Sequence, residues 1–132
     1  MSLTTDDIVA IQQLGAAYCH HMDDGNGAAV AALFTDDGTL EIVDMVKSEG
    51  HEEITANCSV FPDIMPGGRH IVQNMFVDGD GDAATMRAYL ANVVVGDTPT
   101  PVQTGRYVDQ AVRTADGWRF SSRTLTLDGP LF

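Results

Sequence analysis

The chain has 132 residues, of which 44% are hydrophobic, so we expect one domain over residues 1–132 with a real apolar core. Its formal net charge is −12, which argues against nucleic acid and anionic membrane surfaces as partners. Among the classes of ligand, a neutral small molecule is the one that this charge disfavours least. No apolar run approaches the roughly 18 residues that span a bilayer, and the N-terminus lacks a signal-peptide pattern, so we expect a cytoplasmic protein.

The N-terminal segment is predicted to form an amphipathic helix from about Thr5 to Met22. Apolar side chains recur there at steps of three and four residues and form one stripe, which comprises Ile8, Ile11, Leu14, Tyr18 and Met22. Thr4 or Thr5 can cap this helix, and the acidic Asp6 and Asp7 suit the positive end of its dipole.

Two shorter helices and one strand are predicted before the chain becomes rich in β-structure. The first helix covers residues 26–34, with Asn26 as its cap, and is followed by a turn at 36–38 and a strand over 39–46. The other helix lies within residues 50–61. Prolines and glycines over residues 62–68 then break the chain.

The second half of the chain is predicted to form an antiparallel meander. Its strands cover residues 69–77, 83–95, 102–113 and 118–127, with turns at 78–81 and 116–117. Helices that precede a block of strands are typical of the α+β class. A curved sheet that closes over three helices would leave a hollow between the two layers.

Two local patterns could suggest a metal site, but neither has suitable spacing. Cys19 precedes two histidines directly, and neighbouring residues on a helix point in different directions. Asp78, Asp80 and Asp82 imitate the start of a calcium loop, whose sixth position here is Ala83 rather than Gly. We therefore expect no metal site.

The predicted strand over residues 69–77 carries polar side chains on a covered face. Alternation places His70, Val72, Asn74 and Phe76 on one face, and both faces of the strand are mostly apolar. Buried polar groups need hydrogen-bond partners. His70 and Asn74 therefore either satisfy each other or the backbone, or they belong to a functional site.

Asp23 is an unusual residue for the last turn of a helix. Its carboxylate would face the negative end of the helix dipole, so helix stability does not explain it. It either belongs to the following loop or has a functional role, and the residues alone leave both open. Tyr18 precedes Asp23 by five residues, about 140° of helix rotation, yet both could border one pocket if the helix end crosses its mouth.

Several short motifs follow one another over nearly the whole chain. They are Tyr18-Cys-His-His-Met-Asp23, Leu33-Phe34-Thr35-Asp36-Asp37-Gly38, Gly50-His-Glu-Glu-Ile54, His70-Ile-Val-Gln-Asn74, Gly105-Arg106-Tyr107-Val108-Asp109, and Asp116-Gly117-Trp118-Arg119-Phe120 with Arg123. Their order and spacing resemble the SnoaL-like group of the nuclear transport factor two-like superfamily. The resemblance implies a cone, in which three helices pack on a curled, mainly antiparallel sheet around an apolar pocket.

The same resemblance implies a cofactor-independent lyase or isomerase, of dehydratase or cyclase type, that acts on a small polycyclic or carbonyl compound. In the dehydratase-like members a strand histidine pairs with an aspartate at the end of the first helix, and His70 and Asp23 match these positions. Tyr18 would donate a hydrogen bond to the developing oxyanion. The other residues expected to contact substrate are Asn74, Phe34, Met22, Val72, Phe76, Tyr89 and Arg106.

This chain also departs from the pattern that it resembles. Scytalone dehydratase has a second pocket histidine, whereas no histidine follows His70 here, and Met22 replaces a tyrosine. Either Arg106 or Arg123 could supply a cation to the pocket.

A non-catalytic ligand-binding member of the fold is the alternative function, and a partner-binding module that uses the open sheet face is a third. Such a face would expose an apolar patch, for example at 93–95, and homodimerisation would cover it.

Overall fold

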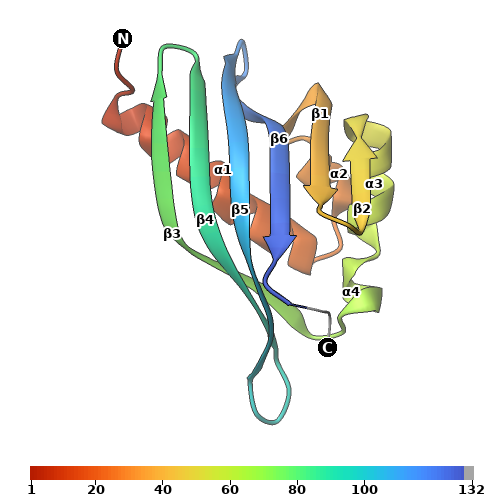
Figure 1. The fold of residues 1–132 in the computed structure, drawn as a ribbon. Helices are drawn as coiled ribbons and strands as arrows, with labels where there is room; N and C mark the ends of the chain where they lie inside the picture. Colours follow the sequence, from red (N-terminus) through yellow and green to blue (C-terminus); the bar gives the residue numbers. More distant parts are fainter. Residues whose placement is uncertain (130–132) are drawn as a thin grey trace.

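The computed structural model describes residues 1–129, which form one sheet with helices on one of its faces (Figure 1). The helices are α1 (Thr5–Asp23), α2 (Gly27–Ala31), α3 (Gly50–Ser59) and α4 (Phe61–Ile64). The strands are β1 (Phe34–Ile42), β2 (Val46–Glu49), β3 (Gly68–Asp80), β4 (Ala83–Val94), β5 (Thr100–Thr114) and β6 (Gly117–Leu127). None of the helices in this part of the chain is long and apolar enough to span a bilayer.

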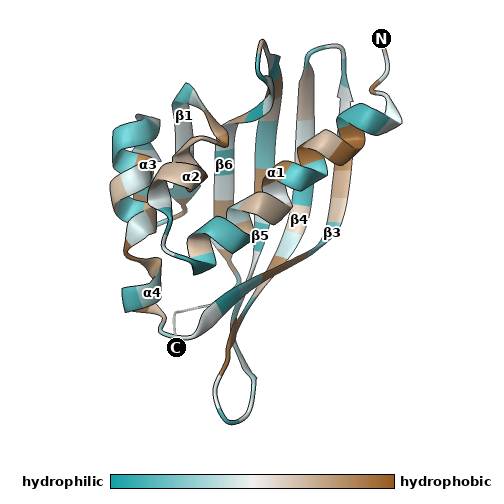
Figure 2. Cartoon of the chain, turned by 180° about the vertical axis from the view of Figure 1, so that it is seen from behind, coloured by the Kyte–Doolittle hydropathy of each residue, from teal (hydrophilic) through white to brown (hydrophobic). Residues whose placement is uncertain are grey.

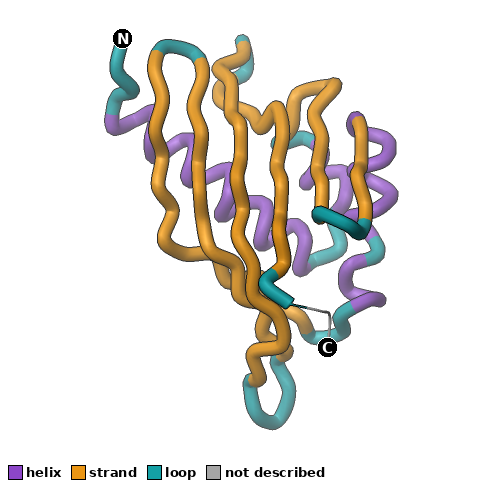
Figure 3. The backbone as a smooth tube through the Cα atoms, viewed as in Figure 1, coloured by secondary structure: helices purple, strands orange, loops and turns teal. Residues whose placement is uncertain are grey.

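The sheet has the strand order β2-β1-β6-β5-β4-β3. All neighbouring strands are antiparallel except β1 and β6, which are parallel. The strands form one curled layer, and the helices lie together on its inner face (Figures 2 and 3). The predicted α+β class and the predicted arrangement of helices on a curled, mainly antiparallel sheet are therefore confirmed.

The first helix follows its predicted pattern closely. Thr4 caps it with a capping box, in which the Asp7 backbone N–H donates to the Thr4 hydroxyl and the Thr4 N–H donates to the Asp7 carboxylate. Its stripe, including Ile11 and Leu14, is buried against the sheet. Apolar burial of this stripe holds α1 across β3 and β6, so the C-terminal end of α1 reaches the start of β3 (Figure 1).

The region between the first helix and the meander differs from the prediction. The second helix ends at Ala31, and Phe34 already begins β1, which runs through the predicted turn at 36–38 with a register shift between Phe34 and Thr39. Pairing with β6 at Phe34 and again from Thr39 onwards holds both ends of this segment in the sheet, and sequence pattern does not contain that information. The short strand β2 was not predicted, and the third predicted helix is divided into α3 and α4.

A bulge in β3 reverses the alternation of its side chains. Asn74 has a positive φ of 58°, and the pairing with β4 shifts register between Gln73 and Phe76. As a result Met75 packs against the core with Val72, whereas Phe76 is 59% exposed. The prediction that Asn74 and Phe76 share the face of His70 is therefore wrong, because strict alternation does not hold across an extra residue.

Asp7 connects the start of α1 to strands β5 and β6. Its carboxylate accepts a hydrogen bond from Trp118 Nε1 at 3.1 Å and lies 3.0 Å from Arg113 Nη1. The hydrogen bond from Arg113, the Thr4 backbone N–H and the Trp118 N–H together hold the pKa of Asp7 well below its ordinary value of 3.8, against a smaller effect of burial.

Replacing Asp7 with Asn should therefore destabilise the protein in a pH-dependent way. A depressed pKa in the folded state stabilises the fold above the ordinary pKa, and this contribution is lost as the pH falls below about 4. Urea unfolding at neutral pH should show a lower free energy of unfolding for Asp7→Asn than for wild type, and the difference should shrink at pH 3. The exposed neighbour provides a control, Asp6→Asn, and an equal loss at both pH values would contradict the prediction.

Candidate functional site

Asp23 and His70 are in direct contact at the end of the molecule where α1 meets β3. His70 Nδ1 lies 2.7 Å from Asp23 Oδ1, and the His70 backbone N–H donates to both carboxylate oxygens at 3.1 and 3.2 Å. The His70 side chain is 5% exposed and the Asp23 side chain is 15% exposed. The carboxylate thus fixes the strand and the imidazole ring at once, which gives the helix-end aspartate a specific partner.

This contact sets the tautomer of the His70 ring. An ionised carboxylate can only accept hydrogen bonds, so Nδ1 carries the proton in the neutral imidazole. The lone pair that can accept a proton is therefore on Nε2, which has no hydrogen-bond partner among residues 1–129. The arrangement can act as a general base whose protonated form is stabilised by a neighbouring negative charge.

Two aromatic rings enclose the imidazole. The Tyr18 ring meets it edge-on, with centroids 5.9 Å apart, and the Phe61 ring lies at 4.6 Å. Burial raises the pKa of Tyr18 well above its ordinary value, and the opposing effect of the nearby Arg123 charge is smaller. Tyr18 therefore remains protonated and can donate a hydrogen bond. Phe61 was not predicted, because a residue just after a helix break carries no periodic signal.

A buried ion pair lies beneath the tyrosine. Arg123 and Asp109 are fully buried, and Arg123 Nε lies 3.2 Å from Asp109 Oδ1, although the N–H does not point at the oxygen well enough for a hydrogen bond. The guanidinium carbon is 4.2 Å from the Tyr18 ring centroid and 3.7 Å from that of Tyr107. Burial raises the pKa of Asp109 to about 6, although Arg123 acts in the opposite direction. Of the two arginines left open by the sequence, Arg123 is therefore the one on the inner face.

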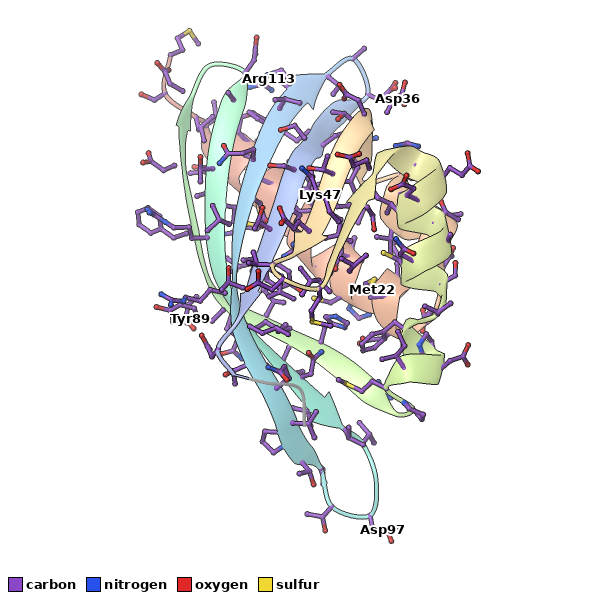
Figure 4. All side chains as sticks on the ribbon, turned by 45° about the vertical axis from the view of Figure 1, so that its right-hand side comes forward. Met22, Asp36, Lys47, Tyr89, Asp97 and Arg113 are labelled. Carbon is purple, nitrogen blue, oxygen red and sulfur yellow. The ribbon has the colours of Figure 1, made fainter. Side chains whose placement is uncertain are left out.

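The remaining predicted residues fall into two groups. Met22 and Phe34 are buried in the core and Val72 is half-buried beside it, all on the inner face. The other four lie on the outer face of the sheet and comprise Asn74, Phe76, Tyr89 and Arg106. Figure 4 shows Tyr89 on the side of the sheet away from α3 and Met22 on the helical side.

The expectation that these four residues line the same pocket as His70 is therefore wrong. For Asn74 and Phe76 the cause is the bulge in β3. For Tyr89 and Arg106 the cause is strand phase. The residues on either side of each, Ala88 and Leu90 on β4 and Gly105 and Tyr107 on β5, are buried, so Tyr89 and Arg106 point to the other face.

Cysteine or metal chemistry is not indicated by the described residues. Burial raises the pKa of Cys19 to about 11 and that of Cys58 to about 12, so both remain thiols rather than nucleophilic thiolates. Within residues 1–129 no three His, Cys, Asp or Glu side chains are grouped as metal ligands would be.

Comparison with known proteins places the chain among small cone-shaped domains. A structure from Nostoc punctiforme, described as a protein of unknown function with a cystatin-like fold, has a TM-score of 0.91 at 26% identity and covers 99% of this chain and 98% of that chain. A Novosphingobium aromaticivorans structure named as a candidate aromatic ring hydroxylase has a TM-score of 0.80 at 31% identity and covers 98% of this chain and 94% of that chain.

A second Novosphingobium aromaticivorans structure, named as a candidate scytalone dehydratase, shares the fold with a TM-score of 0.79 at 20% identity, over 96% of this chain and 89% of that chain. No functionally curated protein matches the sequence. The sequence matches the SnoaL-like domain over residues 4–124, which is most of its length. The chain belongs to the SnoaL-like domain family.

Proposed function

We propose that this protein is a cofactor-independent lyase or isomerase that removes a proton from a carbon next to a carbonyl group of a small cyclic compound. The observation that carries the proposal is the buried contact of 2.7 Å between His70 Nδ1 and Asp23, which leaves Nε2 as the proton acceptor. The family includes dehydratase- and cyclase-like relatives, and a structural neighbour bears the name of a dehydratase. Both reaction types can begin with the removal of such a proton.

The proposed first step transfers one proton and leaves its electron pair on the substrate. His70 Nε2 takes the proton from carbon, the C–H electrons form a carbon–carbon double bond, and the carbonyl π-electrons move to oxygen. Asp23 stabilises the imidazolium that results. In an elimination the enolate re-forms the carbonyl and expels a hydroxyl group, which leaves as water with the proton from His70. In an isomerisation His70 returns the proton to another carbon.

Tyr18 and Arg123 support the negative charge that develops on the carbonyl oxygen. The Tyr18 hydroxyl remains protonated because burial raises its pKa, so it can donate to that oxygen. Arg123 lies against the Tyr18 ring and places a positive charge beneath the donor. In a buried site such preorganised charge acts more strongly than it would in water.

The reaction class can be tested without knowing the natural substrate. The wild-type protein is incubated in D₂O with cyclohexanone, β-tetralone and a steroid ketone, and mass spectrometry follows deuterium uptake and loss of water. We expect uptake above the buffer rate for at least one ketone. A ketone that binds, as judged by titration calorimetry, but exchanges no faster than in buffer would favour the alternative of a ligand-binding protein and contradict the enzymatic proposal.

We also propose that the protein forms a homodimer through the outer face of β3, β4 and β5. Large apolar side chains are exposed on this face, namely Ile71, Phe76, Tyr89 and Val108. A hollow of about 700 Å³ lies among Ile71, Tyr89 and Arg106. Arg87 stacks on Phe76, and Arg106 and Asp128 both line the hollow, so this face of a chain of net charge −12 carries charges of both signs.

The Tyr89→Lys substitution should convert a dimer to a monomer, because it places a charge in the middle of this face. Sedimentation velocity at micromolar concentration measures the change. Val9, which is exposed on α1, provides the matched control Val9→Lys, and this variant should remain dimeric. A wild-type protein that sediments as a monomer would contradict the proposed dimer.

A further inference from the structure

Three polar side chains form a row across the inner face of the sheet. In the strand register His70 on β3 lies directly opposite Asn92 on β4, and Asn92 lies directly opposite Gln103 on β5. Directly opposite residues of antiparallel strands point to the same face, and all three side chains are buried. The row begins at the candidate base and ends two strands away. It starts beside the C-terminal end of α1, where Asp23 contacts His70.

The carboxamide of Gln103 has an unused acceptor. Its Nε2 donates to the carbonyl oxygens of Thr104 at 3.4 Å and Gly129 at 3.3 Å. The opposite orientation of the amide would place its oxygen against these two carbonyls, so the contacts fix which atom is which. Oε1 is buried and has no donor among residues 1–129, while the whole residue is only 7% exposed. This oxygen therefore requires a hydrogen-bond donor that the described residues do not supply.

Asn92, between the two, is also weakly bonded. Its Nδ2 reaches the Arg69 carbonyl oxygen only at 3.5 Å, at the limit of a hydrogen bond. A ligand that crossed the sheet along the row would therefore meet a polar side chain on each of three strands. Adjacent strands are separated by about 4.8 Å, so the row spans about 10 Å from His70 to Gln103.

We propose that Gln103 is a specificity-determining residue whose Oε1 accepts a hydrogen bond from a hydroxyl or N–H group of the ligand. This inference rests on the proposed function, since it places the reacting carbon of the ligand at His70. The ligand is then an elongated compound with a hydrogen-bond donor about 10 Å from the reacting carbon. A single six-membered ring is too short for both contacts, whereas three linearly fused rings with polar groups at both ends match them.

Two three-ring probes test this proposal by titration calorimetry. Anthraflavic acid carries a hydroxyl group at each end, and monohydroxyanthraquinone carries one at one end only. The wild-type protein should bind the dihydroxy probe about tenfold more tightly, the effect of one further hydrogen bond. The Gln103→Met variant should lose this preference, because it removes the acceptor oxygen. Gln110 lies on the outer face of the same strand, and Gln110→Met should bind both probes as wild type does.

Equal affinities of the wild-type protein for the two probes, or no binding of either, would overturn the proposal. An equal loss for both probes in Gln103→Met would also overturn it, because that result would mean a structural role for an amide satisfied by fixed water. The test is separate from that of the proposed function. If a ketone takes up deuterium in a His70-dependent way but substitution of Gln103 leaves the binding of both probes unchanged, only the proposal for Gln103 fails.

Discussion

Replacing Asp23 with Asn should reduce the rate of protein-catalysed deuterium uptake by a cyclic ketone on the order of 10²–10⁴-fold. The carboxylate keeps the proton of His70 on Nδ1 across a distance of 2.7 Å. An Asn amide group can instead donate to Nδ1 and favour the tautomer with its proton on Nε2, the atom proposed to act as the base. The negative charge that stabilises the imidazolium is also removed.

The control for this variant is Asp24→Asn, a change of the same type at the exposed next residue. Its rate should remain within about twofold of wild type, because a surface residue without a special contact has little effect. Asp23 also binds the His70 backbone N–H, so thermal unfolding should accompany the kinetics and establish that each variant is folded at the assay temperature. A folded Asp23→Asn protein with the wild-type rate would contradict a role for the aspartate in proton transfer.

Replacing Arg123 with Met should lower the free energy of unfolding by about 3–5 kcal/mol at pH 8. The substitution leaves the carboxylate of Asp109 buried without its cation. In the wild-type protein burial already raises the pKa of Asp109 to about 6, and Arg123 is the group that limits this rise. Without Arg123 the pKa of Asp109 should increase further, so the loss of stability should be larger at pH 8 than at pH 5.

The pH dependence follows from the sign of the shift. A carboxyl group whose pKa is raised in the folded state binds a proton more readily there than in the unfolded chain, so stability falls as the pH rises towards the folded-state pKa. In Arg123→Met the free energy of unfolding continues to fall above pH 6, whereas that of the wild-type protein no longer changes there. Guanidinium chloride unfolding at the two pH values measures the difference.

Two further variants control for the loss of the arginine itself. The double variant with Arg123→Met and Asp109→Leu should recover most of the stability, since an apolar pair can replace a buried ion pair. Arg106→Met removes an exposed arginine that lies 4.0 Å from Asp128, and it should cost less than about 1 kcal/mol. A loss for Arg123→Met that is small, or equal at both pH values, would contradict the importance of this buried pair.

The residues around His70 were predictable because two independent signals converged on them. A polar residue on a covered strand and a carboxylate at the unfavourable end of a helix each required an explanation, and the family resemblance connected the two. Tyr18 was expected to border the same pocket and, from the family resemblance, to donate a hydrogen bond to the developing oxyanion. The structure places Asp23 against Nδ1 of His70 and the Tyr18 ring edge-on to the imidazole.

The outer-face residues could not be assigned correctly from the sequence, for reasons that are local and physical. The bulge at Asn74, where φ is positive, places an extra residue in β3 relative to β4. Nothing in the alternation of side chains along the sequence reveals this bulge. Arg123 and Asp109 lie directly opposite each other only because β5 and β6 pair in one register. A signal was present, however, since Asp109 shares the strand phase of the apolar Tyr107 and Ala111.

The rate of deuterium uptake by the best ketone substrate, compared between wild type and His70→Gln at equal concentrations of folded protein, tests the central claim most directly. The glutamine side chain is polar and of similar reach but cannot act as a base near neutral pH. If His70 Nε2 accepts the proton, the wild-type protein exchanges the ketone well above the buffer rate and His70→Gln falls to that rate. Exchange that persists in folded His70→Gln would show that another group removes the proton, and the account given for Asp23 and His70 would be wrong.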